Sequence, residues 1–98
     1  MMEGKVLILI GSASDAETMR AAAEVLSGYG IPCEMTIASA HRSPGRTQAL
    51  ARRAEKEGFS VIIAGAGAAA HLAGSVAAET VLPVIGRASC RERVSVVV

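Results

Sequence analysis

The stretch Lys5–Asp15, KVLILIGSASD, decides the fold of this 98-residue chain. Its first part, Lys5–Ile10, is an almost unbroken apolar run between two glycines, which is typical of a strand buried on both faces of a parallel sheet. A short polar segment follows, and apolar residues then recur at helical spacing. A buried strand that leads through a tight polar turn into an amphipathic helix is the repeating unit of an α/β protein.

The same alternation of strand and helix continues to about residue 85. Further strands are predicted at Cys33–Ala38, Phe59–Ala64 and Val81–Ile85, and further helices from Pro44 to about Glu57 and through an Ala-rich stretch that ends near Thr80. Pro83 indicates an edge position for the fourth strand or a place among its first residues. Alternating strands and helices joined by short loops predict a three-layer α/β fold with a parallel, doubly wound sheet and right-handed crossovers.

The first helix is expected to pack one broad apolar face against this sheet. Ser14 or Asp15 can cap its start, and Gly28, Gly30 and Pro32 mark its end. The apolar face predicted from the helical spacing consists of Met19, Ala22, Ala23, Val25, Leu26 and Tyr29.

The final segment, Arg87–Val98, differs in character from the rest of the chain. It places three arginines and one glutamate beside an apolar end. We expect a charged turn that leads into another strand. No helical pattern follows this strand, so one face of it has no predicted cover and the sheet is incomplete at the C-terminus.

The composition excludes several classes of function. Hydrophobic residues make up 51% of the chain but aromatic residues only 2%, so a core of small aliphatic side chains is expected and base-stacking surfaces are not. The net charge of +1 provides no long-range attraction to nucleic acid or to an anionic membrane. The apolar runs are too short to span a bilayer, and the N-terminus does not resemble a signal peptide. A cytoplasmic location and a small-molecule partner are therefore predicted.

Three loops follow the carboxyl ends of predicted strands, where α/β sheets bind their ligands. The first is Gly11–Asp15. The hydroxyls of Ser12 and Ser14, together with the amino end of the following helix, suit a phosphate group. Asp15 would repel phosphate and is better suited to accept hydrogen bonds from ribose hydroxyls. The alternative is that these residues merely cap the helix.

The second loop, Ser39–Pro44, joins a histidine to an arginine. Arg42 offers a fork of donors that matches phosphate oxygens, and His41 can exchange a proton near neutral pH. A surface loop with solvated charges is the alternative. Pro44 suits the first turn of the next helix.

The third loop, Gly65–His71, consists mostly of glycine and alanine. Such residues allow the backbone to approach a ligand closely, although the loop is not a dinucleotide fingerprint because it follows the third strand. His71 could equally cap the helix. Since all three loops share one edge of the sheet, together they favour a site for a phosphorylated metabolite, with His41 as the group that transfers a proton.

The motifs in these loops resemble a known family. They are Gly11-Ser12-x-Ser14-Asp15, Ser39-Ala40-His41-Arg42-Ser43-Pro44 and Gly65-Ala66-Gly67-x-Ala69-Ala70-His71-Leu72-x-Gly74. In order and spacing they are similar to those of the bacterial-type N5-carboxyaminoimidazole ribonucleotide mutases, also named the catalytic subunit of phosphoribosylaminoimidazole carboxylase. The resemblance extends from about Val6 to Gly86 and favours the mutase over the animal-type carboxylase.

This resemblance implies a flavodoxin-like enzyme of purine (IMP) biosynthesis. It would interconvert N5-carboxyaminoimidazole ribonucleotide and 4-carboxy-5-aminoimidazole ribonucleotide without a metal or organic cofactor. His41 would carry the proton between the exocyclic nitrogen and carbon 4. The implied substrate-binding residues are Ser12, Ser14 and Arg42 for the phosphate, Asp15 for the ribose, Ser39, Gly67 and Ala68 for the ring and carbon dioxide, and the adjacent His71 and Leu72. The family's homo-octamers share sites between neighbouring subunits.

The chain departs from the family pattern at several positions. Ala68 replaces a usual glycine, Ala73 a usual proline and Ser43 a common threonine. Residues 1–86 are interpreted as the N-terminal part of the mutase-like domain, and residues 87–98 as an atypical tail on a truncated or frame-shifted chain. The alternatives are a carboxylase that uses carbon dioxide directly, a non-catalytic nucleotide-binding module, and a destabilised fragment that aggregates.

Overall fold

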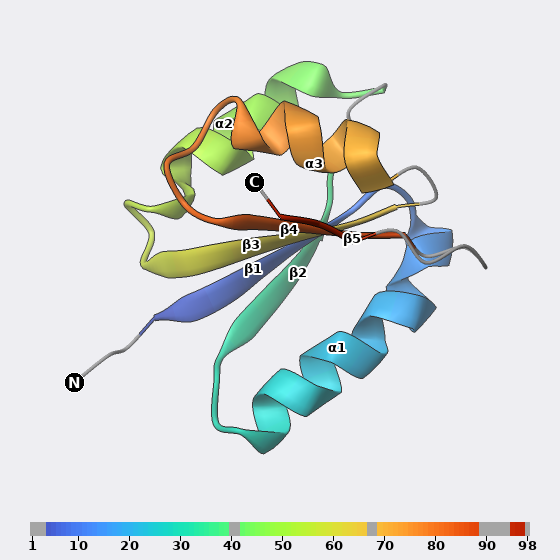
Figure 1. The fold of residues 1–98 in the computed structure, drawn as a ribbon, viewed down its shortest axis with the longest axis vertical. Coiled ribbons are helices and arrows are strands. Elements are labelled where there is room, and N and C mark those ends of the chain that lie inside the picture. The colour runs from blue at the N-terminus through green and yellow to red at the C-terminus, as the bar shows by residue number, and fades with distance from the viewer. Residues whose placement is uncertain (1–3, 40–41, 67–68, 89–94, 98) are drawn as a thin grey trace.

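The computed structural model describes residues 4–39, 42–66, 69–88 and 95–97, in which one sheet carries helices on both faces (Figure 1). The strands are β1 (Lys5–Ile10), β2 (Cys33–Ile37), β3 (Phe59–Ala66), β4 (Val84–Ala88) and β5 (Ser95–Val97). The helices are the short 3-10 turn η1 (Ala13–Asp15), α1 (Ala16–Gly28), α2 (Pro44–Ala54) and α3 (Ala69–Ala77).

The strand order is β2-β1-β3-β4-β5, and the first four strands are parallel. This is the flavodoxin-like order of a doubly wound sheet, and the reversal of strand order lies between β1 and β3. The predicted fold class is confirmed. The strand expected in the tail is also present, and it pairs antiparallel with β4, with Arg87 opposite Ser95.

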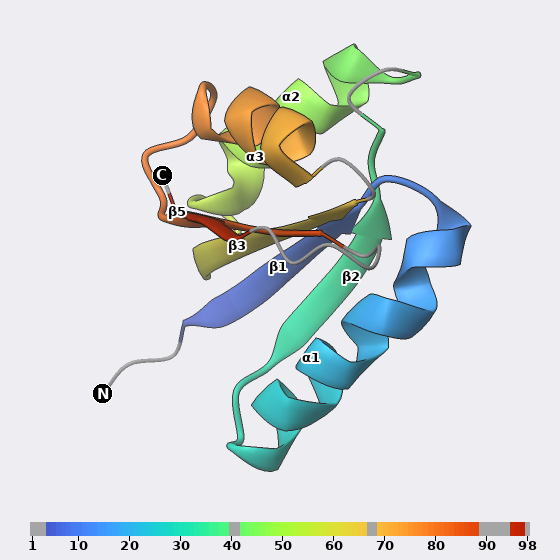
Figure 2. The same ribbon diagram turned by 45° about the vertical axis from the view of Figure 1, so that its right-hand side comes forward.

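The two faces of the sheet have separate cores. α1 covers one face, and α2 and α3 cover the other (Figure 2). In β1, Val6, Ile8 and Ile10 pack with Met19 of α1, whereas Leu7 and Leu9 belong to the larger cluster under α2 and α3. A strand between two layers of helices must be apolar at every position, and this explains the unbroken run in the sequence.

The fourth strand begins three residues later than predicted. The hydroxyl of Thr80 accepts the backbone N–H of Leu82 at 3.1 Å, which forms a turn. The carbonyl of Pro83 then accepts the N–H of Ile62 at 3.0 Å. Pro83 therefore directly precedes β4, which is an inner strand between β3 and β5 and not an edge strand.

Other element boundaries were also wrong by a few residues. β3 extends to Ala66, so Gly65 and Ala66 lie in the strand and not in a loop. Both α2 and α3 end three residues before the predicted positions, at Ala54 and Ala77. Apolar and alanine-rich composition does not fix where a helix ends, because the chain turns only where a competing set of hydrogen bonds forms.

The predicted apolar face of α1 is only partly correct. Met19 is buried, and Ala22, Ala23 and Leu26 pack around it, but Val25 is 60% exposed and Tyr29 80% exposed. Tyr29 lies just beyond the last turn of α1, before Gly30 at φ 76°. Asp15 occupies the N-cap position of α1, as predicted, although its side chain makes no capping hydrogen bond to α1. Instead, Ser12 and Asp15 form a capping box that begins η1.

Close packing between α1 and β3 requires a glycine at position 65. A Cβ atom on Gly65 would lie 2.5 Å from Sδ and 2.6 Å from Cγ of Met19, which is fully buried. These distances are shorter than van der Waals contact, so the methionine would have to move.

We expect Gly65→Ala to lower the free energy of unfolding by about 1–3 kcal/mol, measured by urea denaturation. In a Met19→Ala background the same change should cost much less, because the clashing atoms are gone. Gly74→Ala is the matched control: it has open space around it in α3 and should be neutral or stabilising. An equal loss from Gly65→Ala in both backgrounds would contradict this packing.

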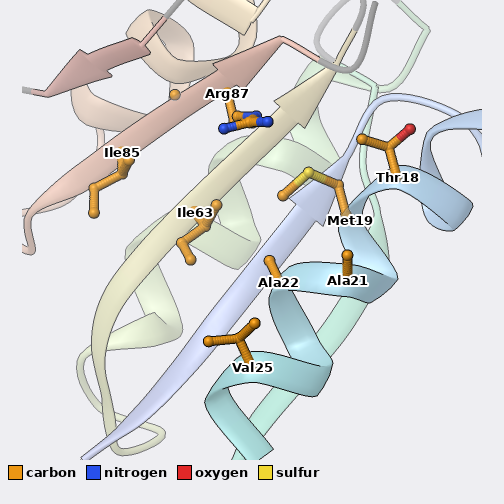
Figure 3. Close-up of a pocket in the computed structure, with 9 residues that line it drawn as sticks. Thr18, Met19, Ala21, Ala22, Val25, Ile63, Ile85 and Arg87 are labelled. Carbon is orange, nitrogen blue, oxygen red and sulfur yellow. The ribbon is translucent and has the colours of Figure 1, made fainter.

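One strip of the sheet lies open beside α1. A groove of about 360 Å³ separates α1 from β3 and β4, and Val25, Ile63 and Ile85 lie along it (Figure 3). Ile85 is 38% exposed. Among the described helices only α1 lies on this face of the sheet.

We expect this apolar strip to promote self-association of the chain. Ile85→Thr or Val25→Ser should each weaken association about five- to tenfold in sedimentation velocity experiments, because each removes buried apolar area from the contact. Val81→Thr, at a residue that is 82% exposed and does not line the groove, serves as the control. If Val81→Thr had the same effect, association through this strip would be refuted.

Candidate functional site

A cavity of about 420 Å³ lies at the carboxyl edge of the sheet. It opens between the segment after β1, the end of β2 and the beginning of α2. The residues that line it are Gly11, Ser12, Ala13, Ile37, Ser39, Arg42, Ser43 and Arg46. The first two predicted loops therefore do meet at one site.

The register of the sheet brings these loops together. Ile10 is paired with Ile37 of β2 on one side and with Gly65 of β3 on the other. The carbonyl of Ile10 accepts the N–H of Ala38 at 2.8 Å, and the N–H of Gly11 donates to the carbonyl of Gly65 at 3.1 Å. The three parallel strands thus end side by side.

In the first loop, Ser12 and Asp15 bind each other. The Asp15 carboxylate accepts hydrogen bonds from the backbone N–H of Ser12 at 3.0 Å and from its hydroxyl at 3.1 Å. Asp15 is only 8% exposed and does not line the cavity, whereas Ser12 does. The capping role considered from the sequence is therefore present, and the ribose-binding role of Asp15 stays a prediction. Ser14 lies in η1, which directly precedes α1.

The second loop is closed by hydrogen bonds at both ends. The Ser39 hydroxyl accepts the N–H of Arg42 at 3.0 Å, and the Ser39 carbonyl accepts the N–H of Ser43 at 2.9 Å. The hydroxyl of Thr47 lies 3.2 Å from the Ser39 carbonyl and 3.1 Å from the Ser43 carbonyl and donates to both. His41 lies outside the described residues.

The third loop starts against the first loop. A Cβ on Gly11 would lie 3.2 Å from the Cβ of Ala66, so the two segments are in close contact. Gly67 and Ala68 lie outside the described residues. His71 is exposed on α3, and Leu72 is buried in the core under α3; neither lines the cavity.

Among the described residues that line the cavity, the charged side chains are those of two arginines. Arg42 and Arg46 are exposed and lie beside the hydroxyls of Ser12, Ser39 and Ser43. Guanidinium groups and hydroxyls are donors, so the cavity suits an anion rich in acceptor oxygens, such as a phosphate. In the part of the chain that the structure describes, no group of three or more His, Cys, Asp or Glu residues could hold a metal ion.

Sequence reasoning missed two residues of this region, Arg46 and Thr47. Arg46 lies in the first turn of α2, where a positive charge opposes the helix dipole, and this was a usable signal. Thr47 is 1% exposed, and its neighbours in the sequence do not indicate that it is buried. Only the tertiary structure places its hydroxyl against the loop.

The sequence matches that of a known protein family. A sequence profile of the family described as AIR carboxylase matches residues 5–94, which is most of the chain. The chain belongs to the AIR carboxylase family. The match continues past Gly86, after which the sequence predicts an atypical tail. The boundary between domain and tail stays a prediction.

Several curated members of the AIR carboxylase family are closely similar. The N5-carboxyaminoimidazole ribonucleotide mutase of Pyrococcus horikoshii is 56% identical over 79 residues, which are 81% of this chain and 45% of that protein. The mutase of Thermotoga maritima is 56% identical over 82 residues, 84% of this chain and 48% of that protein. The phosphoribosylaminoimidazole carboxylase of Saccharomyces cerevisiae is 53% identical over 97 residues, 96% of this chain and 17% of that protein.

The chain thus spans about half the length of the mutases it matches. Among its described residues, no helix is both long and apolar enough to cross a membrane.

We expect Thr47→Val to loosen the second loop and to lower the free energy of unfolding by about 1 kcal/mol, because one buried hydroxyl donor is lost. Hydrogen exchange at the amides of Arg42 and Ser43 should become faster. Thr47→Ser keeps the hydroxyl and should behave like the original chain.

Thr80→Val is the matched control, because it removes a hydroxyl that caps a turn outside the cavity. It should lower stability without changing exchange at Arg42 and Ser43. Unchanged exchange at these amides in Thr47→Val would show that the hydroxyl does not hold the loop.

Proposed function

We propose that this chain forms the nucleotide-binding part of an N5-carboxyaminoimidazole ribonucleotide mutase, an isomerase of purine (IMP) biosynthesis. The observation that carries the proposal is the cavity at the carboxyl edge, which combines Ser12, Ser39 and Arg42 from two separate loops. The identity of more than 50% to curated mutases over most of the chain supports it.

The proposed substrate orientation follows from the donors in the cavity. Ser12 and Arg42 bind the 5′-phosphate, and Ser14, beside them in the chain, adds a hydroxyl. Asp15 is assigned to the ribose hydroxyls, and Ser39 faces the ring. Gly67 and Ala68 are assigned to the side of the pocket that holds the ring and the carbon dioxide. His71 and Leu72, which do not line the cavity, are assigned a supporting role in α3. The small residues of the third loop support a close approach of the backbone to a flat ring.

The proposed reaction transfers a carboxylate within one molecule. The bond between the exocyclic nitrogen and the carboxylate carbon breaks, carbon dioxide forms, and the nitrogen takes a proton. Carbon 4 then attacks the carbon dioxide and loses its own proton. His41, between Ser39 and Arg42, is assigned to give the first proton and to accept the second, so the step needs no net proton.

The chain corresponds to about half the length of the curated mutases it matches. A homo-octamer with sites shared between subunits, as well as a cytoplasmic location, stays a prediction. A direct carboxylase is a second candidate, because two fungal relatives that bear this name are 53% and 56% identical to the chain.

In the test, the full chain is supplied with either N5-carboxyaminoimidazole ribonucleotide or aminoimidazole ribonucleotide. With N5-carboxyaminoimidazole ribonucleotide, nuclear magnetic resonance should detect the product carboxylated at carbon 4. His41→Asn should lower turnover at least about 100-fold while retaining affinity for the nucleotide, since a general acid–base contributes about 10²–10⁴-fold. Arg53→Gln, on the part of α2 outside the cavity, is the control and should keep full turnover.

The outcomes separate the candidates. Product from aminoimidazole ribonucleotide and carbon dioxide, but not from N5-carboxyaminoimidazole ribonucleotide, would replace the mutase with the carboxylase. Saturable binding of aminoimidazole ribonucleotide without turnover would overturn catalysis by this chain and favour a nucleotide-binding module. Full turnover by His41→Asn would overturn the role of His41.

A further inference from the structure

We propose that Arg46 is a second phosphate-binding residue of the cavity, so that a doubly charged phosphate monoester is held between two guanidinium groups. The inference rests on the proposed function and extends it, because neither the sequence motifs nor the assigned site residues include Arg46. It is based on a difference between the arginines of α2: Arg46 lines the cavity, whereas Arg52 and Arg53 lie away from it and pair with carboxylates.

Arg46 lies in the first turn of α2, beside the cavity. Ser43 is the N-cap of α2, and its side chain makes no capping hydrogen bond but lines the cavity. Thr47, the residue after Arg46, points inward and is fully buried. Arg46 itself is exposed and shares the cavity lining with Arg42 and Ser12, which belong to different loops.

The electrostatics of α2 leave Arg46 without compensation in the absence of an anion. The first turn of α2 contains no acidic residue, so nothing there offsets a cation at the positive end of the helix dipole. Among the described residues, no carboxylate lies within 4.0 Å of the guanidinium of either Arg42 or Arg46.

The other two arginines of α2 show the opposite arrangement. Arg52 and Arg53 lie in the last turn, where the dipole favours a positive charge. Arg52 pairs with Glu79 at 2.7 Å, and Arg53 pairs with Glu57 at 3.9 Å. The arginines that are compensated therefore lie away from the cavity, and the two that are not compensated line it.

The charge of the ligand explains why two guanidinium groups are needed. A phosphate monoester carries a charge of about −1.5 to −2 at pH 7, so one arginine leaves it only partly neutralised. Each guanidinium donates paired N–H groups to phosphate oxygens. With Arg42 and Arg46 both present, the site should discriminate strongly between a nucleotide and the corresponding nucleoside.

The experiment measures the affinity of the full chain for aminoimidazole ribonucleotide, its nucleoside and inorganic phosphate by calorimetry. Arg46→Gln should raise the dissociation constants for the nucleotide and for phosphate about tenfold, as expected for the loss of a charged hydrogen bond. The dissociation constant of the nucleoside should not change. Arg46→Lys should restore part of the affinity, because it keeps the charge but loses the planar fork.

Two further variants act as controls. Arg53→Gln removes the same charge from the same helix outside the cavity and should leave all three affinities unchanged. In the double variant Arg42→Gln/Arg46→Gln, the combined loss should differ from the product of the single losses, because both residues contact one phosphate. The melting temperature of Arg46→Gln should be equal to or above that of the original chain, since a cation leaves the positive end of a helix.

The outcomes distinguish this inference from the function on which it rests. If Arg42→Gln weakens nucleotide binding and Arg46→Gln does not, only the role of Arg46 is overturned. If the original chain binds neither the nucleotide nor phosphate, both proposals fail. If Arg46→Gln lowers the melting temperature and weakens nucleoside and nucleotide equally, Arg46 is a structural residue and the inference is wrong.

Discussion

Backbone pairing of β1 on both sides is the constraint on which the rest of the molecule depends. The strand is held between β2 and β3, and Ile10 is in register with both Ile37 and Gly65. Because parallel strands present their carboxyl ends at one edge, this register brings the segments after all three strands together. The cavity forms between the segments that meet at this edge, and its lining residues come from parts of the chain more than 30 positions apart.

The site and the scaffold have opposite requirements. Aliphatic side chains make up most of the core clusters, and Gly65 allows Met19 to pack directly onto β3. At the carboxyl edge, by contrast, donors and positive charges accumulate, and Arg46 occupies a helix position that costs stability. Such a local conflict is typical of binding sites, where charge complementarity to a ligand replaces complementarity within the fold.

The sequence alone predicted the fold class and the order of the elements, because apolar periodicity reflects burial directly. It placed the limits of β1 correctly but misplaced β4 by three residues, since Pro83 and Thr80 act through hydrogen bonds that periodicity does not contain. The convergence of Ser12, Ser39 and Arg42 was also predicted, because strand-end loops must share an edge. The roles assigned to His41, Gly67 and Ala68 stay predictions.

By itself the sequence determined the buried character of β1, the alternation of strand and helix, and the family to which the loop motifs are similar. These features depend on the spacing of residues along the chain. Only the tertiary structure decided that Asp15 binds Ser12, that Leu72 lies in the core, that Thr47 closes the second loop and that Arg46 joins Arg42 at the cavity. Such contacts depend on the register of neighbouring strands and on the rotation of each helix about its axis, and neither is encoded by local spacing.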